Sequence, residues 1–230
     1  MTIANPPTPV QTIEYPESDG QPMAENTKQF EWIVTLEGGL AAQFASDPNV
    51  FVAGDLFWYP VEGRNDIRVA PDVLVVFGRP MGHRGRYLQW AEENIAPQVV
   101  FEIWSPGNTT KDYTNKYRFY NKYGVQEYYL FDPDRKELLG WLRRGDDLVE
   151  IEFMNDWVSP RLGMRFEWDG DELKLYHPNG ERFKTYVELA QSVEAERVRA
   201  EAERARAETE RARAERLAAQ LRARGIEPEA

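Results

Sequence analysis

Cysteine is missing from this 230-residue sequence, and histidine occurs only as His83 and His177. This composition excludes disulfide bonds, thiol nucleophiles and cysteine-ligated zinc or iron within the chain. A metal ion would therefore be bound mainly by oxygen atoms, which favours magnesium or manganese.

Long apolar segments are also missing. No run of about 18 apolar residues could cross a bilayer, and the N-terminus lacks the basic-then-apolar order of a secretory signal. We therefore expect a soluble, cytoplasmic protein. The hydrophobic residues, 42% of the sequence, suffice for one core of ordinary domain size plus an appendage.

Positive charge is in deficit, with 28 Lys and Arg against 39 Asp and Glu and a net charge of -11. This balance disfavours broad, salt-dependent adhesion to nucleic acid. Local contacts with DNA remain open, because aromatic residues could stack on bases or simply pack in the core. Two basic clusters could contact the phosphate backbone or could equally be solvated surface charges: Arg79, Arg84 and Arg86, and Lys111, Lys116, Arg118 and Lys122. The aromatic candidates are Trp58, Tyr59, Trp90 and Trp104.

Composition divides the chain into four segments. Residues 1–24 are rich in proline and predict an extended or disordered arm, residues 25–187 a folded domain, residues 188–225 a charged helix and residues 226–230 a disordered tail. The helical segment repeats Glu-Ala-Glu-Arg-Ala-Arg-Ala with a period of seven, so that Glu and Arg alternate at spacings of three and four. Its seam is mostly alanine, which favours a solvent-exposed helix that associates weakly, with a second copy or a partner, as a coiled coil.

Apolar spacing within the domain predicts one mixed sheet with helices. An amphipathic helix is expected over 25–45 and a second over 112–123, where Gly124 stops it. The second helix joins two strands, so these strands should be parallel. A polar turn at 62–65 should make a hairpin of the first two strands, and the last three should extend the sheet as an antiparallel meander. The expected strands are 50–59, 67–77, 98–104, 127–131, 138–153, 162–168 and 173–176.

Two apolar, β-branched stretches each carry one acid. Asp72 stands near the start of 70–76 (Ala-Pro-Asp-Val-Leu-Val-Val), and Glu102 lies within 97–106 (Pro-Gln-Val-Val-Phe-Glu-Ile-Trp-Ser-Pro). If both stretches are buried strands, two carboxylates converge, and a buried acid is costly without a partner. The partner of lowest cost is a divalent cation or a shared proton, and either makes this a candidate site of chemistry.

A lysine follows on the second predicted helix. Lys116 lies on the same side as Tyr113, Tyr117 and Tyr120, and the crossover should return it to the end of the sheet where the acids lie. Two carboxylates that bind a divalent ion, with a lysine that holds or activates water, form a minimal apparatus for hydrolysing phosphodiesters. Alternatively, the stem of Lys116 merely covers aromatic surface.

The first predicted helix offers two acids that could assist. Glu37 lies within the apolar stripe, so it is either at the edge of the buried face or directed into a site. Glu25 could assist instead, although its place at the helix start equally suits a favourable interaction with the helix dipole.

Over roughly residues 25–185 the chain resembles the Uma-type branch of the restriction-endonuclease-like PD-(D/E)XK superfamily. The matching text comprises 69–73 (Val-Ala-Pro-Asp-Val), 101–106 (Phe-Glu-Ile-Trp-Ser-Pro), 110–112 (Thr-Lys-Asp) followed by Lys116 and Tyr120, and 124–133 (Gly-Val-Gln-Glu-Tyr-Tyr-Leu-Phe-Asp-Pro). The stretch from Pro97 to Pro133 is the specific part of this match.

The resemblance implies an α+β, restriction-endonuclease-like mixed sheet flanked by helices. It also implies a Mg²⁺- or Mn²⁺-dependent endonuclease that hydrolyses DNA, with Asp72 and Glu102 as metal ligands and a helix acid, Glu37, assisting. The lysine expected two residues after Glu102 is replaced by Trp104, so Lys116 is expected to supply the amine. The alternative is a catalytically inactive nuclease-like module that binds or assembles through its C-terminal helix.

Overall fold

The computed structural model describes residues 13–18, 20, 23–168 and 171–224. Most of the predicted arm and all of the predicted tail (226–230) lie outside the described residues. The chain divides into two compact units, Met1–Phe183 and Lys184–Ala230.

The first unit is built on a six-stranded sheet with the strand order β1-β3-β5-β6-β7-β8. Strands β5 and β6 are parallel and joined by helix α2 (Thr110–Lys122), whereas all other neighbours are antiparallel. The predicted mixed sheet is therefore confirmed. Its strands are β1 (Val50–Gly54), β3 (Val73–Phe77), β5 (Val99–Ile103), β6 (Glu127–Asp132), β7 (Glu137–Arg144) and β8 (Asp147–Glu150).

The expectations for the first strand and for the last two were wrong, and the stretch 138–153 forms two strands, β7 and β8. The predicted strand 50–59 is interrupted at Asp55, whose φ of 46° is incompatible with a strand. Beyond this break, β2 (Trp58–Tyr59) forms a separate two-stranded parallel sheet with β4 (Tyr87–Leu88), next to the 3₁₀ helix η1 (Gln89–Glu92). Likewise, β9 (Arg165–Trp168) and β10 (Leu173–Tyr176) do not extend the main sheet but pair with each other.

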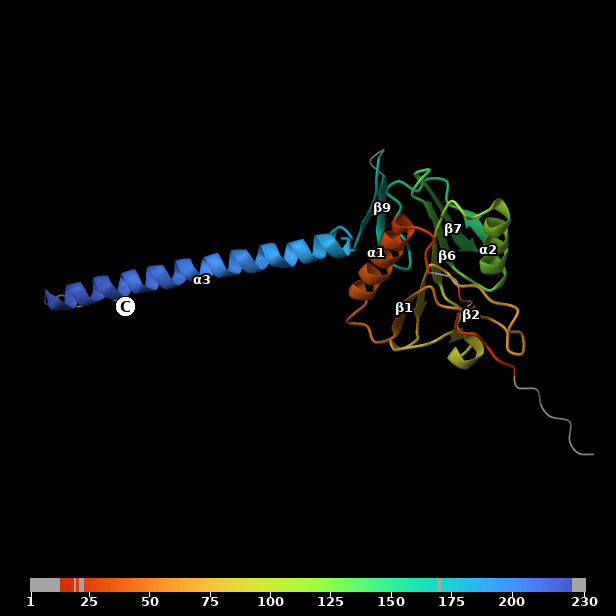
Figure 1. Cartoon of the computed structure of the whole chain (residues 1–230), viewed down its shortest axis with the longest axis horizontal. Coiled ribbons are helices and arrows are strands. Elements are labelled where there is room, and N and C mark those ends of the chain that lie inside the picture. Colours follow the sequence, from red (N-terminus) through yellow and green to blue (C-terminus); the bar gives the residue numbers. More distant parts are fainter. Residues whose placement is uncertain (1–12, 19, 21–22, 169–170, 225–230) are drawn as a thin grey trace, which may run out of the picture. The chain divides into compact units, whose positions relative to one another are not determined.

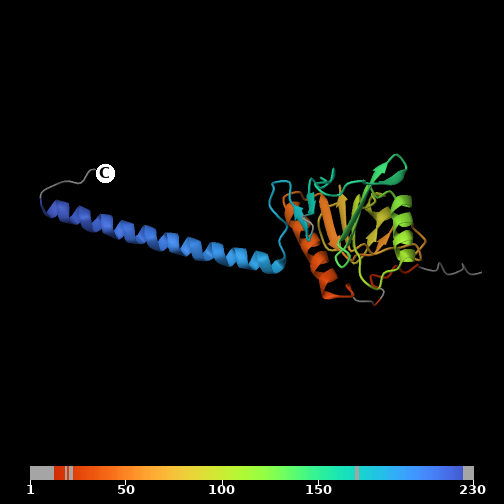
Figure 2. The ribbon, with the colours of Figure 1, turned by 90° about the horizontal axis from the view of Figure 1, so that it is seen from above.

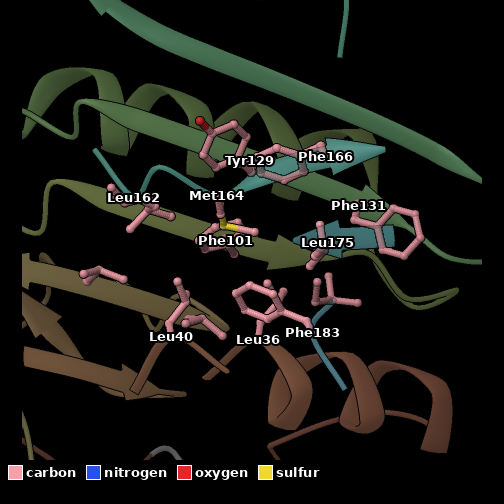
Figure 3. Packing of buried hydrophobic residues seen from close by; sticks show 14 of the residues in the cluster. Leu36, Leu40, Phe101, Tyr129, Phe131, Leu162, Met164, Phe166, Leu175 and Phe183 are labelled. Atoms are coloured by element: carbon pink, nitrogen blue, oxygen red, sulfur yellow. The ribbon is translucent and has the colours of Figure 1, made fainter. Parts of the chain in front are cut away.

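The main sheet lies between α1 (Thr27–Gln43) and α2, as Figures 1 and 2 show. Because side chains alternate along a strand, each strand contributes to both faces. Val73 and Phe101 pack on the α1 side with Leu36 and Leu40, together with β9 and β10 (Figure 3). On the other side, Leu74 and Val100 pack with Tyr120 of α2 and with the side chains of Tyr128 and Trp141. This alternation directs Asp72 and Glu102 toward α2.

The described part of the predicted arm packs against the body. The ring of Tyr15 lies 5.2 Å from Tyr59 and 5.1 Å from Trp90, and its hydroxyl accepts a hydrogen bond from the backbone N–H of Gly63. Tyr15 therefore anchors this segment of the arm to the body.

The second unit contains α3 (Tyr186–Ala223), one continuous helix. Thr185 and Glu188 form a capping box at its start, and Arg197 forms ion pairs with Glu194 and Glu201 along the helix. None of the helices in the described part of the chain is long and apolar enough to span a membrane.

Two adjacent glycines of α1 offer a test of this packing. A Cβ on Gly39 would overlap the buried ring of Phe183, whereas a Cβ on Gly38 would enter open space. We expect Gly39→Ala to lower the free energy of unfolding by about 1–3 kcal/mol through overpacking. Gly38→Ala should raise it by up to about 1 kcal/mol, because alanine favours the helix. Equal effects in urea denaturation would contradict the docking of α1 on Phe183.

Candidate active site

Strand pairing brings Asp72 and Glu102 together. The antiparallel register aligns Val73 with Phe101, so that Asp72, immediately before β3, comes opposite Glu102 on β5. A carboxylate oxygen of Asp72 (Oδ2) accepts a hydrogen bond of 2.6 Å from the backbone N–H of Ile103. The two residues are only 8% and 3% exposed, so both carboxyl groups are largely removed from water.

Burial beside a second acid makes Asp72 difficult to ionise. Burial, followed by the negative charge of Glu102, raises the pKa of Asp72 well above its usual range. A protonated Asp72 reduces the negative charge that is buried beside Glu102.

Helix α2 supplies the remaining compensation. Lys116 Nζ lies 2.6 Å from Glu102 Oε2, and the hydroxyl of Tyr120 donates a hydrogen bond to Glu102 Oε1. Burial acts to lower the pKa of Lys116, but Glu102 and Asp72 outweigh it, so the net shift is upward. Lys116 is therefore a cation at neutral pH, and both oxygens of Glu102 are occupied.

The start of α2 determines where these two side chains lie. Thr109 caps the helix and forms a capping box with Asp112. From this fixed start, Lys116 and Tyr120 follow four residues apart and share the face that lies over the sheet. Burial and then the charge of Glu102 raise the pKa of Tyr120 well above its usual range, so its hydroxyl remains a donor.

Glu37 is not part of this cluster. A Cβ on Gly54 would lie 3.6 Å from Glu37 Cγ, and Gly54 belongs to the α1 side of the sheet, opposite to the side that carries Glu102. Burial alone raises its pKa, and within the described residues Glu37 has no hydrogen bond or ion pair to the cluster. The structure thus places Glu37 near Gly54 on the α1 side of the sheet, and its role as an assisting acid stays a prediction.

Glu25 instead fixes the loop that follows β5. Its Oε2 atom accepts hydrogen bonds from the hydroxyl of Ser105 at 2.5 Å and from the backbone N–H of Gly107 at 3.1 Å. The nearby Gln29 donates a hydrogen bond of 3.0 Å to the backbone carbonyl of Ile103. These contacts hold the end of β5 and the loop before α2, so Glu25 has a supporting position rather than one beside Glu102.

Trp104 occupies the place where the superfamily carries a lysine. Its backbone N–H continues the β5–β6 ladder to the carbonyl of Phe131, and its ring centroid lies 6.3 Å from that of Tyr113. The amine that lies beside Glu102 is that of Lys116. Of the other aromatic candidates, Trp58 and Tyr59 are fully buried in the core.

The first predicted basic cluster is already neutralised. Arg79 and Arg84 form ion pairs with Glu92, and Arg86 pairs with Glu17. Within the second cluster, Lys111 and Arg118 are exposed on α2 and make no ion pair with a described residue. Basic side chains available to a phosphate backbone therefore lie on the helix that carries Lys116.

The donor set of the cluster consists of oxygen atoms only. Within the described part of the chain, no three His, Asp or Glu side chains group closely enough to hold a metal ion. A pair of carboxylates is nevertheless a sufficient protein contribution for Mg²⁺, which keeps several waters and is often bound through one or two carboxylates and the phosphates of a substrate. Asp72 and Glu102 could hold such an ion.

Comparison with known proteins gives one family and several structures. The model of the Uma2 family, described as "Putative restriction endonuclease", matches residues 11–175. One solved structure, "a putative nuclease belonging to DUF820 from Anabaena variabilis ATCC 29413", is 17% identical with a TM-score of 0.44, over 63% of this chain and 79% of that chain. Comparison with curated proteins gives no match.

Removing the acid at Asp72 and removing the cation at Lys116 should change the free energy of unfolding in opposite directions. Because the pKa of Asp72 is higher in the folded state than in the unfolded state, the free energy of unfolding falls as pH rises through that interval. Asp72→Asn removes this pH-dependent loss of stability, and the amide oxygen of asparagine can still accept the hydrogen bond from the backbone N–H of Ile103. Without metal at pH 8 it should therefore be more stable, on the order of 1–2 kcal/mol, with a smaller gain at pH 4.

The matched variant is Lys116→Met, which removes the cation beside two acids and should lower the free energy of unfolding at pH 8. Urea denaturation at both pH values measures the two effects. Destabilisation by Asp72→Asn at pH 8, or a neutral Lys116→Met, would contradict the charge balance described above.

Proposed function

Because the chain belongs to the Uma2 family, we propose that it is a metal-dependent endonuclease that hydrolyses phosphodiester bonds of DNA. The observation that carries this proposal is the cluster of Asp72, Glu102 and Lys116, in which two buried carboxylates meet one protonated amine. A structural ion pair would need only one acid, whereas the second acid here is retained at the cost of a raised pKa.

Asp72 and Glu102 are the proposed ligands of Mg²⁺ or Mn²⁺. The ion, when bound, polarises the phosphate and lowers the pKa of its bound water. The backbone N–H of Ile103 would orient the carboxylate of Asp72 toward such an ion. The hydroxyl of Tyr120 orients Glu102 in the same way.

Lys116 acts as a cation in this proposal. Its raised pKa makes it a poor base for removing a proton from water. Its amine is suited instead to stabilise negative charge that develops on the phosphate, as cationic side chains do in other phosphoryl transfers. Its side chain is 29% exposed, so it also lies between the buried acids and solvent.

Substitutions should separate these roles. Asp72→Asn and Glu102→Gln should each reduce the rate of DNA cleavage by at least about 10³-fold and weaken Mn²⁺ binding, because each removes a ligand. Lys116→Ala should reduce the cleavage rate by about 10²–10³-fold with Mn²⁺ binding retained. Cleavage of supercoiled plasmid and calorimetric titration with Mn²⁺ measure the two effects.

Glu127→Gln is the matched control. Glu127 is another fully buried acid of the same sheet, on the neighbouring strand β6, but its carboxylate accepts hydrogen bonds from Tyr129, Ser159 and Arg161 on the other side of the sheet. It should retain both Mn²⁺ binding and cleavage per folded molecule. If the native protein cuts no DNA in Mg²⁺ or Mn²⁺, and neither acid variant alters metal binding, the proposal fails.

A second candidate function, self-assembly through α3, is supported by the charge pattern of that helix. One row of uncharged residues, which we call the α3 seam, repeats at spacings of three and four: Ala195, Val198, Ala202, Ala205, Thr209 and Ala212. Glu194, Glu201 and Glu208 flank it on one side, and Arg199, Arg206 and Arg213 on the other. In a parallel dimer, each flanking Glu faces an Arg of the second copy five residues later.

Ion pairs within α3 leave two of the three flanking arginines available, whereas Arg213 lies 3.9 Å from Glu210 of the same helix. Arg197 and Arg211, which lie away from the seam, form ion pairs with Glu residues of their own helix. Arg199 and Arg206 form no ion pair within the described part of α3. An antiparallel dimer would oppose Glu to Glu, so the pattern favours parallel helices. The small seam residues indicate a weak association.

Charge reversal tests this assembly. Changing Arg199, Arg206 and Arg213 to Glu should weaken dimerisation of the full chain at least tenfold, and additional Glu194→Arg, Glu201→Arg and Glu208→Arg changes should restore it. The control, Arg197, Arg204 and Arg211 to Glu, changes the net charge equally but away from the seam. Analytical ultracentrifugation measures the dissociation constant. A monomeric native chain, or equal loss in the control, would contradict the parallel pairing.

A further inference from the structure

A pocket of about 190 Å³ lies beside the candidate active site, on the same face of the sheet. Its walls come from the end of β5, the first turn of α2, and the facing ends of β6 and β7. Trp104 and Tyr113 contribute aromatic rings, and Leu130 and Leu139 contribute an apolar floor. The residues that bind DNA in the proposal above do not account for this pocket.

The pocket is adjacent to the two acids. Glu102 is the register partner of Leu130, which lines the pocket. Trp104 follows Glu102 by two residues on the same strand and face, a separation of about 7 Å along a strand. A single nucleotide could therefore place its phosphate at the acids and its base in the pocket.

The lining suits a flat, aromatic ligand with a polar edge. Aromatic side chains bind bases through their faces, and this stacking tolerates any base. The volume is below the range of about 300–1,000 Å³ typical of sites for drug-sized ligands, which indicates a single ring system. Three residues with polar side chains also line the pocket: Thr110, Arg135 and Glu137.

The lining also contains an ordered anchor. Asp132 is 5% exposed and accepts hydrogen bonds from the backbone N–H groups of Asp134 and Arg135. It also lies 3.7 Å from Arg135 Nε, so it holds the turn on which Arg135 stands. The exposed carboxylate of Glu137 makes no hydrogen bond or ion pair with a described residue, and such a group accepts from the amino group of a base.

We propose that this pocket, walled by Trp104 and Tyr113, binds one unstacked nucleobase next to the phosphodiester that Asp72 and Glu102 address. This inference rests on the proposed nuclease function and deepens it, because it assigns Trp104 a part in substrate binding where the superfamily has a lysine. The base must leave its stack to enter, so single-stranded or locally opened DNA is the preferred substrate. The free carboxylate of Glu137 favours cytosine, adenine or guanine over thymine in this position.

The test measures binding of the full chain, carrying Asp72→Asn to prevent cleavage, to a short single-stranded oligonucleotide with Ca²⁺ present. A series of oligonucleotides places one abasic site at successive positions. One abasic position should weaken binding of the Asp72→Asn chain about tenfold, the effect of losing one stacked base. Adding Trp104→Ala should weaken binding to the intact oligonucleotide by a similar factor and make it insensitive to the abasic site.

Two matched variants accompany it. Trp104→Phe keeps an aromatic face and should retain most of the affinity, and Trp90→Ala removes an aromatic that packs on Tyr15 and should leave binding unchanged. Circular dichroism and thermal unfolding establish that each variant is folded. Equal loss of affinity in Trp90→Ala, or an abasic effect that persists in Trp104→Ala, would overturn the proposal.

A cleavage assay on the chain with Asp72 intact tests the nuclease function separately from the base pocket. If it cuts single-stranded DNA in Mn²⁺ but no abasic position matters, the base pocket is wrong and the nuclease function stands. If it cuts no DNA while one abasic position still weakens binding, the pocket stands and the nuclease function is wrong.

Discussion

The burial of Asp72 and Glu102 side by side, opposite each other in the β3–β5 register, is the constraint on which the rest of the site depends. Two acids can lie side by side in a sheet only if their charges are offset. Here the amine of Lys116 pairs with Glu102, and the raised pKa of Asp72 favours its neutral form. The register of β3 and β5, the capped start of α2 and the protonated state of Lys116 all follow from this requirement or serve it.

This arrangement is costly for the folded protein without a ligand. The pKa of Asp72 is well above the ordinary range of an aspartic acid, and Lys116 is partly buried where it pairs with Glu102. Charges maintained at such cost commonly mark functional sites, because the interaction that relieves them is the one made with a ligand. A hard divalent cation relieves both acids at once, which is why we place it in the proposed mechanism.

Much of the fold and the centre of the site could be predicted from the sequence. The β-branched stretches predict β3 and β5 with the acids that they carry. The helix expected between two strands predicts the parallel pair β5–β6 and places Lys116 over the sheet. The position of Glu37 could not be predicted, because an apolar stripe shows that a helix packs but not which face of the sheet it covers. The break in the first strand depends on the positive φ of Asp55, and the separate pairing of β9 with β10 depends on tertiary packing. Neither feature changes the periodicity of apolar residues in the sequence. Helical spacing places Tyr120 on the side of α2 that carries Lys116, but its hydrogen bond to Glu102 depends on how the helix packs on the sheet.

Diffraction from crystals soaked in Mn²⁺, recorded with its anomalous signal, tests the central claim most directly. The account predicts one peak between the carboxylates of Asp72 and Glu102, at about 2.0–2.3 Å from an oxygen of each. The peak should be absent from crystals of Asp72→Asn. Density elsewhere, or a Mn²⁺-soaked structure with no peak between the two carboxylates, would contradict the account.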